Sequence, residues 1–176
     1  MTITQNQYMN VIIAIVGPSG SGKTTMANIM AEHGIPTIVS YTTRPMRDGE
    51  TNGKEHWFVS PDQKPDENQM IAYTKFGDYE YWATRQQIQS ICTYVIDEKG
   101  IEYLLKRLSS NTVLFTLYLD RSLEDRIDSG VDKERCERDN NRIQIPLDKY
   151  DYVIHNNYTL EEFEKKIKEL TYELMK

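Results

Sequence analysis

The chain has 176 residues, of which 39% are hydrophobic and 27% charged, a composition that suits one folded domain and argues against intrinsic disorder. Its net charge of −6 argues against a protein that binds nucleic acid or anionic membranes through charge. The longest aliphatic run, residues 11–16, is far shorter than the roughly 20 residues that cross a bilayer. Cys92 and Cys136 form neither a metal-binding pattern nor a disulfide framework. With no recognisable secretory signal, we expect a soluble, cytoplasmic protein.

The amino-terminal part is predicted to form a buried strand, a glycine-rich turn and a helix. Residues 11–16 (VIIAIV) are aliphatic throughout, as in a parallel strand that is covered on both faces. The turn spans residues 17–22, and the helix spans residues 23–33 before a glycine and a proline end it. A second short strand is predicted at residues 37–40.

The middle of the chain has the composition of a small β lobe. Residues 41–54 are rich in glycine, proline and charge, which favours an irregular loop. Three short strand patterns then follow, the last two separated by a Gly-Asp hairpin signal, at residues 56–60, 70–76 and 79–84. A short helix is predicted at residues 85–91. These short strands indicate a lobe inserted into a larger fold.

Strands and helices alternate again in the carboxyl-terminal part. Strands are predicted at residues 93–97, 113–120 and 150–156, and helices at residues 98–108, within 122–142 and from residue 160 onward. Thr159 and Glu162 form a capping box before this last helix, which has apolar residues at spacings of three and four. The alternation predicts an α/β fold with a parallel sheet.

The most specific motif is Gly17-Pro-Ser-Gly-Ser-Gly-Lys-Thr24, a complete GxxxxGK[ST] phosphate-binding loop. Glycines let backbone N–H groups surround a phosphate, and the helix that follows adds its amino-terminal dipole. Lys23 would neutralise β/γ-phosphate charge, and the Thr24 hydroxyl would bind Mg²⁺. An ordinary glycine-rich turn is the alternative, but the flanking strand and helix favour nucleotide binding. The nucleotide-binding residues predicted here are Gly17, Ser19, Gly20, Ser21, Gly22, Lys23, Thr24 and Thr25.

A phosphate-binding loop alone does not separate kinases from GTPases, motor ATPases or transporters. The chain has no NKxD-type segment that reads guanine and is short for an ATPase with sensor elements. A basic segment soon after the first helix favours phosphoryl transfer to a small acceptor.

The run Ser40-Tyr-Thr-Thr-Arg-Pro-Met-Arg47, followed by Gly49-Glu50 and Asn52-Gly53-Lys54, resembles the guanylate kinase family. The resemblance covers most of the chain. It implies a three-layer P-loop core (residues 11–40, 92–121 and 150–176) with a parallel sheet. It also implies an acceptor-binding lobe at about residues 41–91 and a helical lid at about residues 122–149. ATP would be the phosphoryl donor, with Mg²⁺ as cofactor, and the partners would be small-molecule nucleotides.

The resemblance also implies a set of acceptor-binding residues. A guanidinium group can bind two oxygens of a phosphate at once, in a bidentate contact. Arg44 and Arg47 match the family's phosphate-binding arginines. In the family, two tyrosines also hold the monophosphate. Tyr81 matches one of them, and His56 stands where the other is expected. The full acceptor set is Ser40, Arg44, Arg47, His56, Tyr81 and Asp97. The alternative is that Arg44, Arg47 and Lys54 are solvated loop charges, balanced by Asp48, Glu50 and Glu55.

Two departures from the family pattern leave open which nucleobase the acceptor carries. The expected glutamate falls on Ala72 and the expected hydroxyl residue on Ala83, so two groups that would pair with guanine are apolar. A different phosphorylated small molecule is therefore an alternative acceptor. A binding module without catalysis is a further alternative, although Lys23 and Thr24 are intact.

Further site residues come from the lid and from the strand ends. Arg126 matches a family lid arginine, and Arg138 and Arg142 are predicted, with Lys23 and Arg44, to be catalytic. Asp97 is predicted to bind Mg²⁺ or the acceptor, with a helix N-cap as its structural alternative. Asn156 is predicted to lie near the ATP base, or to serve a turn.

Overall fold

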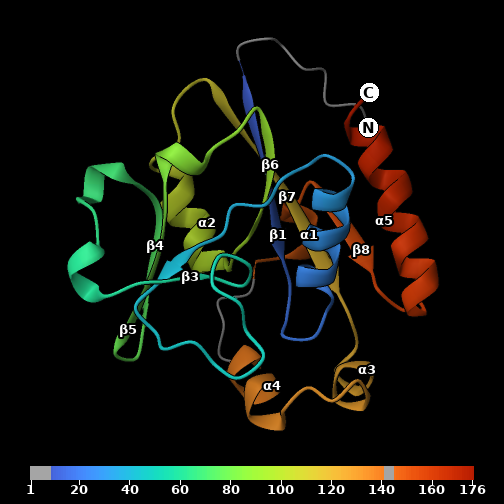
Figure 1. Cartoon of the computed structure of the whole chain (residues 1–176). Coiled ribbons are helices and arrows are strands. Elements are labelled where there is room, and N and C mark those ends of the chain that lie inside the picture. Colours follow the sequence, from blue (N-terminus) through green and yellow to red (C-terminus); the bar gives the residue numbers. More distant parts are fainter. Residues whose placement is uncertain (1–8, 141–144) are drawn as a thin grey trace.

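The computed structural model describes residues 9–140 and 145–176. Its main element is a sheet of four parallel strands in the order β6-β1-β7-β8, with helices on both faces (Figure 1). These strands are β1 (Asn10–Val16), β6 (Ile91–Val95), β7 (Thr112–Asp120) and β8 (Tyr152–His155). The arrangement confirms the predicted α/β class and the parallel sheet.

Strand β1 explains why the sheet needs two helical layers. Its side chains alternate between the two faces. Ile13 and Ile15 face a cluster that contains residues of α1 (Lys23–Glu32) and α5 (Leu160–Leu174). Ile12, from the same strand, faces a second cluster that contains a residue of α2 (Glu98–Leu105). Because both faces are buried, the strand is aliphatic throughout.

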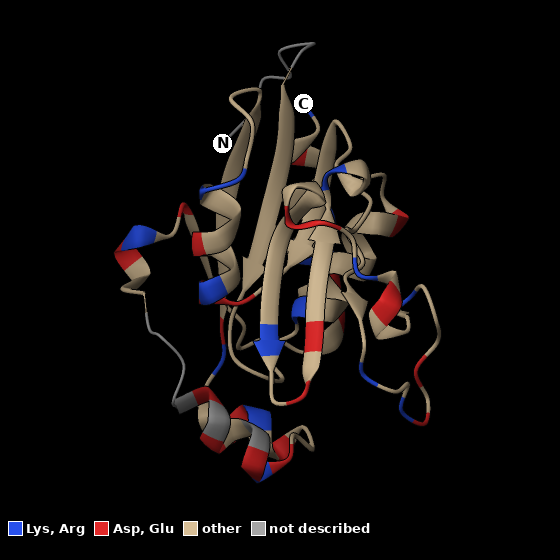
Figure 2. Cartoon of the chain, turned by 90° about the vertical axis from the view of Figure 1, so that its left-hand side faces the viewer, with Lys and Arg blue, Asp and Glu red and all other residues tan. Residues whose placement is uncertain are grey.

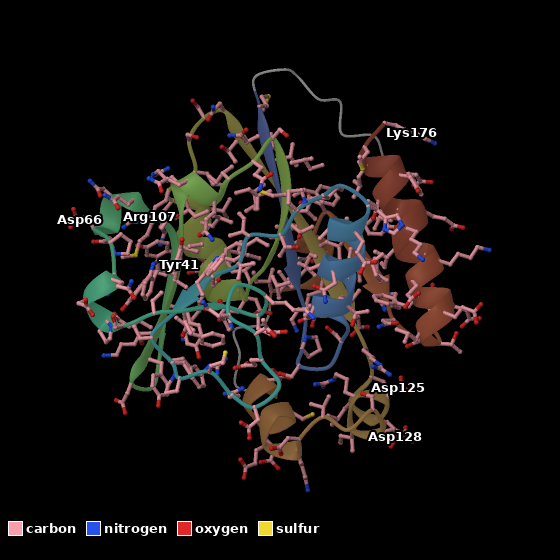
Figure 3. The ribbon with its side chains drawn as sticks, in the orientation of Figure 1. Tyr41, Asp66, Arg107, Asp125, Asp128 and Lys176 are labelled. Atoms are coloured by element: carbon pink, nitrogen blue, oxygen red, sulfur yellow. The ribbon has the colours of Figure 1, made fainter. Side chains whose placement is uncertain are left out.

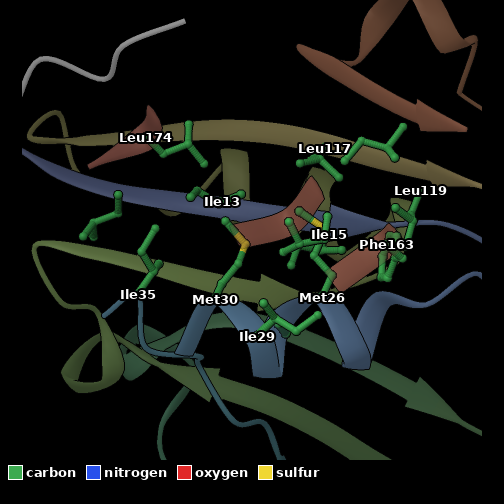
Figure 4. Close-up of a cluster of buried hydrophobic side chains, with 14 of the residues drawn as sticks. Ile13, Ile15, Met26, Ile29, Met30, Ile35, Leu117, Leu119, Phe163 and Leu174 are labelled. Atoms are coloured by element: carbon green, nitrogen blue, oxygen red, sulfur yellow. The ribbon is translucent and has the colours of Figure 1, made fainter. Parts of the chain in front are cut away.

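Helices α1 and α5 cover the first face of the main sheet. Met26 and Met30 of α1 and Phe163 of α5 pack with Ile15 of β1 (Figure 4). The predicted capping box begins α5, because the Thr159 side chain accepts from the Glu162 backbone N–H. This packing fixes the amino terminus of α1 directly after the carboxyl end of β1.

A second, smaller sheet lies beside α2. It consists of β3 (Trp57–Phe58), β2 (Tyr41–Thr42), β5 (Tyr79–Thr84) and β4 (Met70–Phe76), in that order. Tyr41 stacks against Trp82 with ring centroids 5.9 Å apart. Arg107, just after α2, pairs with Glu67 and lies over the Tyr103 ring. The Arg107–Glu67 pair, together with the packing of Ala72 and Ala83 against Ile12 and Leu104, holds the small sheet against the main fold.

Helices α3 (Leu123–Asp128) and α4 (Lys133–Asn140) follow β7. They lie at the end of the molecule opposite the carboxyl terminus (Figure 1). The labels on Asp125 and Asp128 show α3 at the end opposite Lys176 (Figure 3). Three-residue 3-10 turns lie at Pro61–Gln63, Glu67–Gln69, Arg85–Gln87 and Leu147–Lys149. Within the described ranges, every helix is too short or too polar to pass through a lipid bilayer.

Several predicted boundaries are wrong. The strand expected at residues 37–40 is a single bridge from Thr37 to Thr93, because the chain then leaves β6 and pairs with the small sheet from Tyr41 onward. The helix expected at residues 85–91 is one 3-10 turn, because Ile91 already pairs with β1. The helical stretch after Ser122 divides at Gly130, whose φ of +86° does not continue a helix.

Candidate active site

The glycine-rich turn lies where the sequence predicts it, between the carboxyl end of β1 and the first residue of α1. Gly22 caps α1 with a φ of +103°, and a Cβ at this position would lie 3.0 Å from Nδ2 of Asn156. Gly20 has a φ of +78° and no room for a side chain beneath Val131. Glycine is therefore required at both positions for backbone conformation and for space.

Three side chains support the turn by binding its carbonyl oxygens. Nδ2 of Asn156 donates to the Ser21 carbonyl at 2.8 Å, and Nη1 of Arg126 donates to the Ser19 carbonyl at 3.2 Å. Nη1 of Arg121 donates to the Gly20 carbonyl at 3.1 Å. Because side chains satisfy these carbonyl oxygens, the carbonyls do not need the backbone N–H groups of the turn as partners. Those N–H groups are the ones that bind an anion.

A cavity of about 570 Å³ opens in front of the turn, and we call it the donor pocket. It is lined by Ser19, Gly20, Gly22, Lys23, Thr24, Thr25, Val95, Ile96, Asp97, Arg121, Ser129 and Val131. Gly17 and Ser21, which were also predicted to bind nucleotide, are buried within the turn. Nζ of Lys23 donates to the Pro18 carbonyl at 2.7 Å.

A second cavity of about 400 Å³ adjoins the first, and we call it the acceptor pocket. Thr24 and Val95 line both cavities. The acceptor pocket contains five of the six predicted acceptor residues, namely Ser40, Arg44, Arg47, His56 and Tyr81. The sixth, Asp97, lines the donor pocket instead.

The Arg44 side chain is buried and fixed by one carboxylate. Its Nη1 and Nη2 donate to the two carboxylate oxygens of Glu50 at 2.9 and 2.8 Å, and its guanidinium lies 5.2 Å from the centre of the Phe58 ring. The Arg44 hydrogen bonds lower the pKa of Glu50 to about 2. Oε2 of Glu50 also accepts from the Arg47 backbone N–H at 2.8 Å, so this carboxylate organises the loop that carries both arginines.

Glu50 balances the charge of Arg44, as the alternative expected, but Arg44 is buried and lines the pocket, so it is not a solvated loop charge. Arg47 and Lys54 are exposed and line the same pocket. Three cationic side chains thus line the acceptor pocket beside Glu50 and Glu55, and such groups can bind an anionic group.

Of the remaining acceptor residues, Ser40 and His56 lie in loops and Tyr81 lies in β5. Burial, followed by the charge of Arg44, lowers the pKa of His56 below its usual 6.5, so the imidazole is neutral at pH 7. Oγ of Ser40 and the Tyr94 hydroxyl lie 2.9 Å apart, and burial raises the pKa of Tyr94 to about 12. The Ser40 hydroxyl is thus held by a tyrosine that stays protonated.

Ala72 and Ala83 lie away from the acceptor pocket walls. They are Cα partners on β4 and β5, and both are buried in the cluster around Ile12 and Leu104. In this structure the two alanines fill the contact between the small sheet and the main fold.

Asp97 has the N-cap role that was the structural alternative for it. Its Oδ1 accepts from the Gly100 N–H at 2.7 Å at the start of α2. The residue is half-buried on the donor pocket wall, so capping and a role in the pocket are compatible.

The predicted lid arginines have different outcomes. Arg126 is buried and binds the Ser19 carbonyl, behind the donor pocket wall. The side chain of Arg138 and the whole of Arg142 lie outside the described residues. Asn156 is buried beneath the turn as a support.

Two residues of the site escaped sequence reasoning. Arg121 directly follows β7, and its position at the carboxyl end of a parallel strand was the available signal. Asp139 lies in a mixed-charge helix, and only the folded chain brings its carboxylate to Ser19. No local pattern identifies that contact.

The donor set fits a magnesium nucleotide. The exposed Thr24 hydroxyl and the Asp97 carboxylate line the same pocket, and Mg²⁺ is typically held by few protein oxygens together with substrate phosphates. Among the described residues there is no cluster of three or more His, Cys, Asp or Glu side chains that could hold a metal alone. Phosphate oxygens would therefore complete the coordination.

The parallel sheet, the glycine turn and the two joined pockets define a P-loop nucleotide-binding α/β protein with a second anion-binding pocket. A family model described as guanylate kinase matches residues 8–174. The guanylate kinase of Aster yellows witches'-broom phytoplasma is 30% identical over 84% of this chain and 79% of its own length. The guanylate kinase of Chlamydia caviae is 29% identical over 83% and 80%.

The crystal structure of guanylate kinase from Anaplasma phagocytophilum has the same fold, with a TM-score of 0.66 and 24% identity over 96% of this chain and 88% of that one. The chain belongs to the guanylate kinase family. This confirms the resemblance that the run from Ser40 to Arg47 indicated.

Proposed function

We propose that this protein is an ATP-dependent nucleoside monophosphate kinase that transfers the γ-phosphoryl group of ATP to GMP or a related monophosphate. The observation that carries the proposal is the junction of the two pockets at Thr24 and Val95. The phosphate-binding turn lines one pocket, and Arg44, Arg47 and Lys54 line the other. Two anionic substrates can thus be held with their phosphates facing each other, as in-line transfer requires.

On the donor side, the turn would hold the ATP phosphates through its N–H groups. Lys23 would leave the Pro18 carbonyl and bind the β- and γ-phosphates. Thr24 and Asp97 would hold Mg²⁺, which would supply charge neutralisation at the same phosphates. No side chain needs to act as a nucleophile, because the acceptor phosphate oxygen attacks the γ-phosphorus directly.

On the acceptor side, Arg47 and Lys54 would meet the monophosphate, and Arg44 would add its charge from a fixed position beside Glu50. Neutral His56 and the Tyr81 hydroxyl can each donate a hydrogen bond to a phosphate oxygen. Ser40, held by Tyr94, would contact the nucleoside. Restraining the acceptor in this way lowers the entropic cost of reaching the transition state.

We further propose a lid at about residues 122–149, an acceptor lobe at about residues 41–91, and a core of residues 11–40, 92–121 and 150–176. Arg126 would bind ATP from the lid, and Arg138 and Arg142 would supply positive charge to the transferring phosphoryl group. The position of α3 and α4 beside the donor pocket supports this division, because Val131 and Ser129 line that pocket.

The proposal is tested by a coupled assay of ADP release with Mg²⁺-ATP and a panel of GMP, dGMP, AMP, CMP, UMP and dTMP. We expect saturable turnover with at least one purine monophosphate. An ATP-binding protein that turns over none of the panel would contradict the kinase assignment.

A second acceptor class is supported by the burial of Ala72 and Ala83. The base would find hydroxyls of Thr37 and Ser40 and the Asn28 amide on the pocket wall, but no carboxylate from strand β4. A different phosphorylated small molecule would then be the preferred acceptor. Saturation by such a compound, together with failure of GMP to bind, selects this alternative.

We propose the cytoplasm as the compartment of the protein. Cys92 and Cys136 are both buried free thiols, which is typical of a reducing environment. Fractionation of cells that express the chain tests this proposal.

A further inference from the structure

An acidic side chain of the chain itself occupies the anion-binding turn. Oδ2 of Asp139, in α4, accepts a hydrogen bond from the Ser19 backbone N–H at 2.7 Å. Oδ1 of the same carboxylate lies 3.3 Å from the Ser19 hydroxyl. The two residues are 120 positions apart in the sequence, so the contact is tertiary and not a local cap.

The Asp139 carboxylate also has a cationic partner that belongs to the site. Nη1 of Arg126 lies 3.1 Å from Oδ2 of Asp139 and also donates to the Ser19 carbonyl. The Arg126 and Asp139 side chains are only 8% and 11% exposed. A backbone N–H of a phosphate-binding turn and a guanidinium are both groups with which proteins commonly hold a phosphate oxygen.

We propose that Asp139 is an internal competitor for the donor phosphates, a residue that sets the affinity of the donor pocket by occupying Ser19 and Arg126 when ATP is absent. The inference rests on the proposed function, since it takes ATP as the ligand of the turn. ATP must displace the carboxylate, because two anions cannot share the same N–H and guanidinium without strong repulsion. The apparent affinity for ATP is therefore lower than the intrinsic affinity of the turn.

The displacement also links binding to α4. In the present state, Asp139 connects α4 to the turn, and the mixed charges of this helix are visible in Figure 2. Once the phosphates take the Ser19 N–H, Arg126 exchanges a carboxylate for a phosphate partner, and α4 is released from the turn. Asp139 thus couples occupation of the donor pocket to the position of the helix that carries Arg138.

The competing explanation is that Asp139 is a structural support of the turn. The two explanations predict opposite signs for one measurement. If Asp139 competes, its neutralisation strengthens ATP binding. If Asp139 supports the turn, its neutralisation weakens ATP binding, because the turn loses the shape that surrounds the phosphates.

The experiment is isothermal titration of the full chain with Mg²⁺-ATP, without any acceptor, for wild type and Asp139→Asn. We expect Kd to fall by about fivefold in Asp139→Asn, as the competent fraction of the turn rises. The matched control is Glu137→Gln, which removes the same charge from an exposed position of the same helix. We expect Kd in this control to stay within about twofold of wild type, since exposed charges are screened.

An unchanged or higher Kd in Asp139→Asn, or an equal gain in Glu137→Gln, would overturn the proposal. A melting curve checks that Asp139→Asn is folded, and Asp139→Ala provides a second neutral variant that must change Kd in the same direction. The titration involves no phosphoryl transfer. A chain that binds ATP but phosphorylates nothing would therefore disprove the proposed function and leave the role of Asp139 intact. A chain that phosphorylates a monophosphate, but whose Kd for ATP does not fall in Asp139→Asn, would disprove the role of Asp139 and leave the proposed function intact.

Discussion

The two pockets recognise anionic groups by different means. The donor pocket is built on backbone, since a glycine turn of positive φ precedes a helix amino terminus and is supported by side chains behind it. The acceptor pocket is built on side chains of an irregular segment, in which Arg44 is fixed by Glu50 and lies over the Phe58 ring. A backbone site is robust to changes at most surrounding side chains. A side-chain site depends on each ion pair that orients it.

The largest expected effect is at Lys23, the cationic side chain of the phosphate-binding turn itself. Lys23→Met keeps the length of the side chain and removes its charge, so turnover is expected to fall at least about 100-fold. Because the turn is held by backbone and by Asn156, the melting temperature should stay near that of wild type. Lys165→Met, on the exposed face of α5, is the control and should retain full activity. Near-normal turnover in Lys23→Met would remove Lys23 from the mechanism.

On the acceptor side, one substitution should affect both stability and binding. Glu50→Gln leaves the buried Arg44 without its charged partner, which is expected to lower the free energy of unfolding by about 2 kcal/mol. The acceptor KM should rise more than the ATP KM, because Arg44 is then free to rotate. Denaturant unfolding and initial rates give the two quantities, with Asp48→Asn in the same loop as control. Equal changes in both KM values would mean that Glu50 does not specifically organise the acceptor pocket.

The contrast between the pockets also explains what sequence reasoning could reach. The strand at residues 11–16, the turn and α1 follow from a continuous local pattern, and so does the hairpin of β4 and β5, whose predicted bounds match the structure. The acceptor residues came from a resemblance, which supplied Arg44 and Tyr81. Neither route reveals that Glu50 binds Arg44 with both oxygens or that Asp139 reaches Ser19. Such contacts depend on tertiary placement, for which a single sequence carries no local signal.

The pH dependence of the acceptor side sharpens the comparison further. The pKa of Glu50 is about 2 in the folded protein against an ordinary value of 4.5, so its contribution to stability is present above pH 4.5. This contribution is lost as the pH falls from 4.5 toward 2, because Glu50 is protonated first in the unfolded chain. The difference in unfolding free energy between wild type and Glu50→Gln should therefore be constant from pH 5 to 8 and should shrink in acid. Urea melts at several pH values measure it, and a difference that grows in acid would contradict the assigned ion pair.

The smallest expected effect is at His56. Its pKa is lowered chiefly by burial, so the unfolded chain binds a proton more readily than the folded one. Stability should consequently decrease as the pH falls below 6.5, the usual value for histidine. His56→Tyr keeps a hydrogen-bond donor and removes this titration, so the stability of the variant should depend less on pH between 7 and 5.5, while turnover at pH 7.5 remains. His56→Phe lacks the donor and should raise the acceptor KM at every pH. If the stability of His56→Tyr declined as much as that of wild type between pH 7 and 5.5, the titrating group would have to be another residue. The acceptor pocket would then depend less on its buried side chains than its contrast with the backbone-built donor pocket implies.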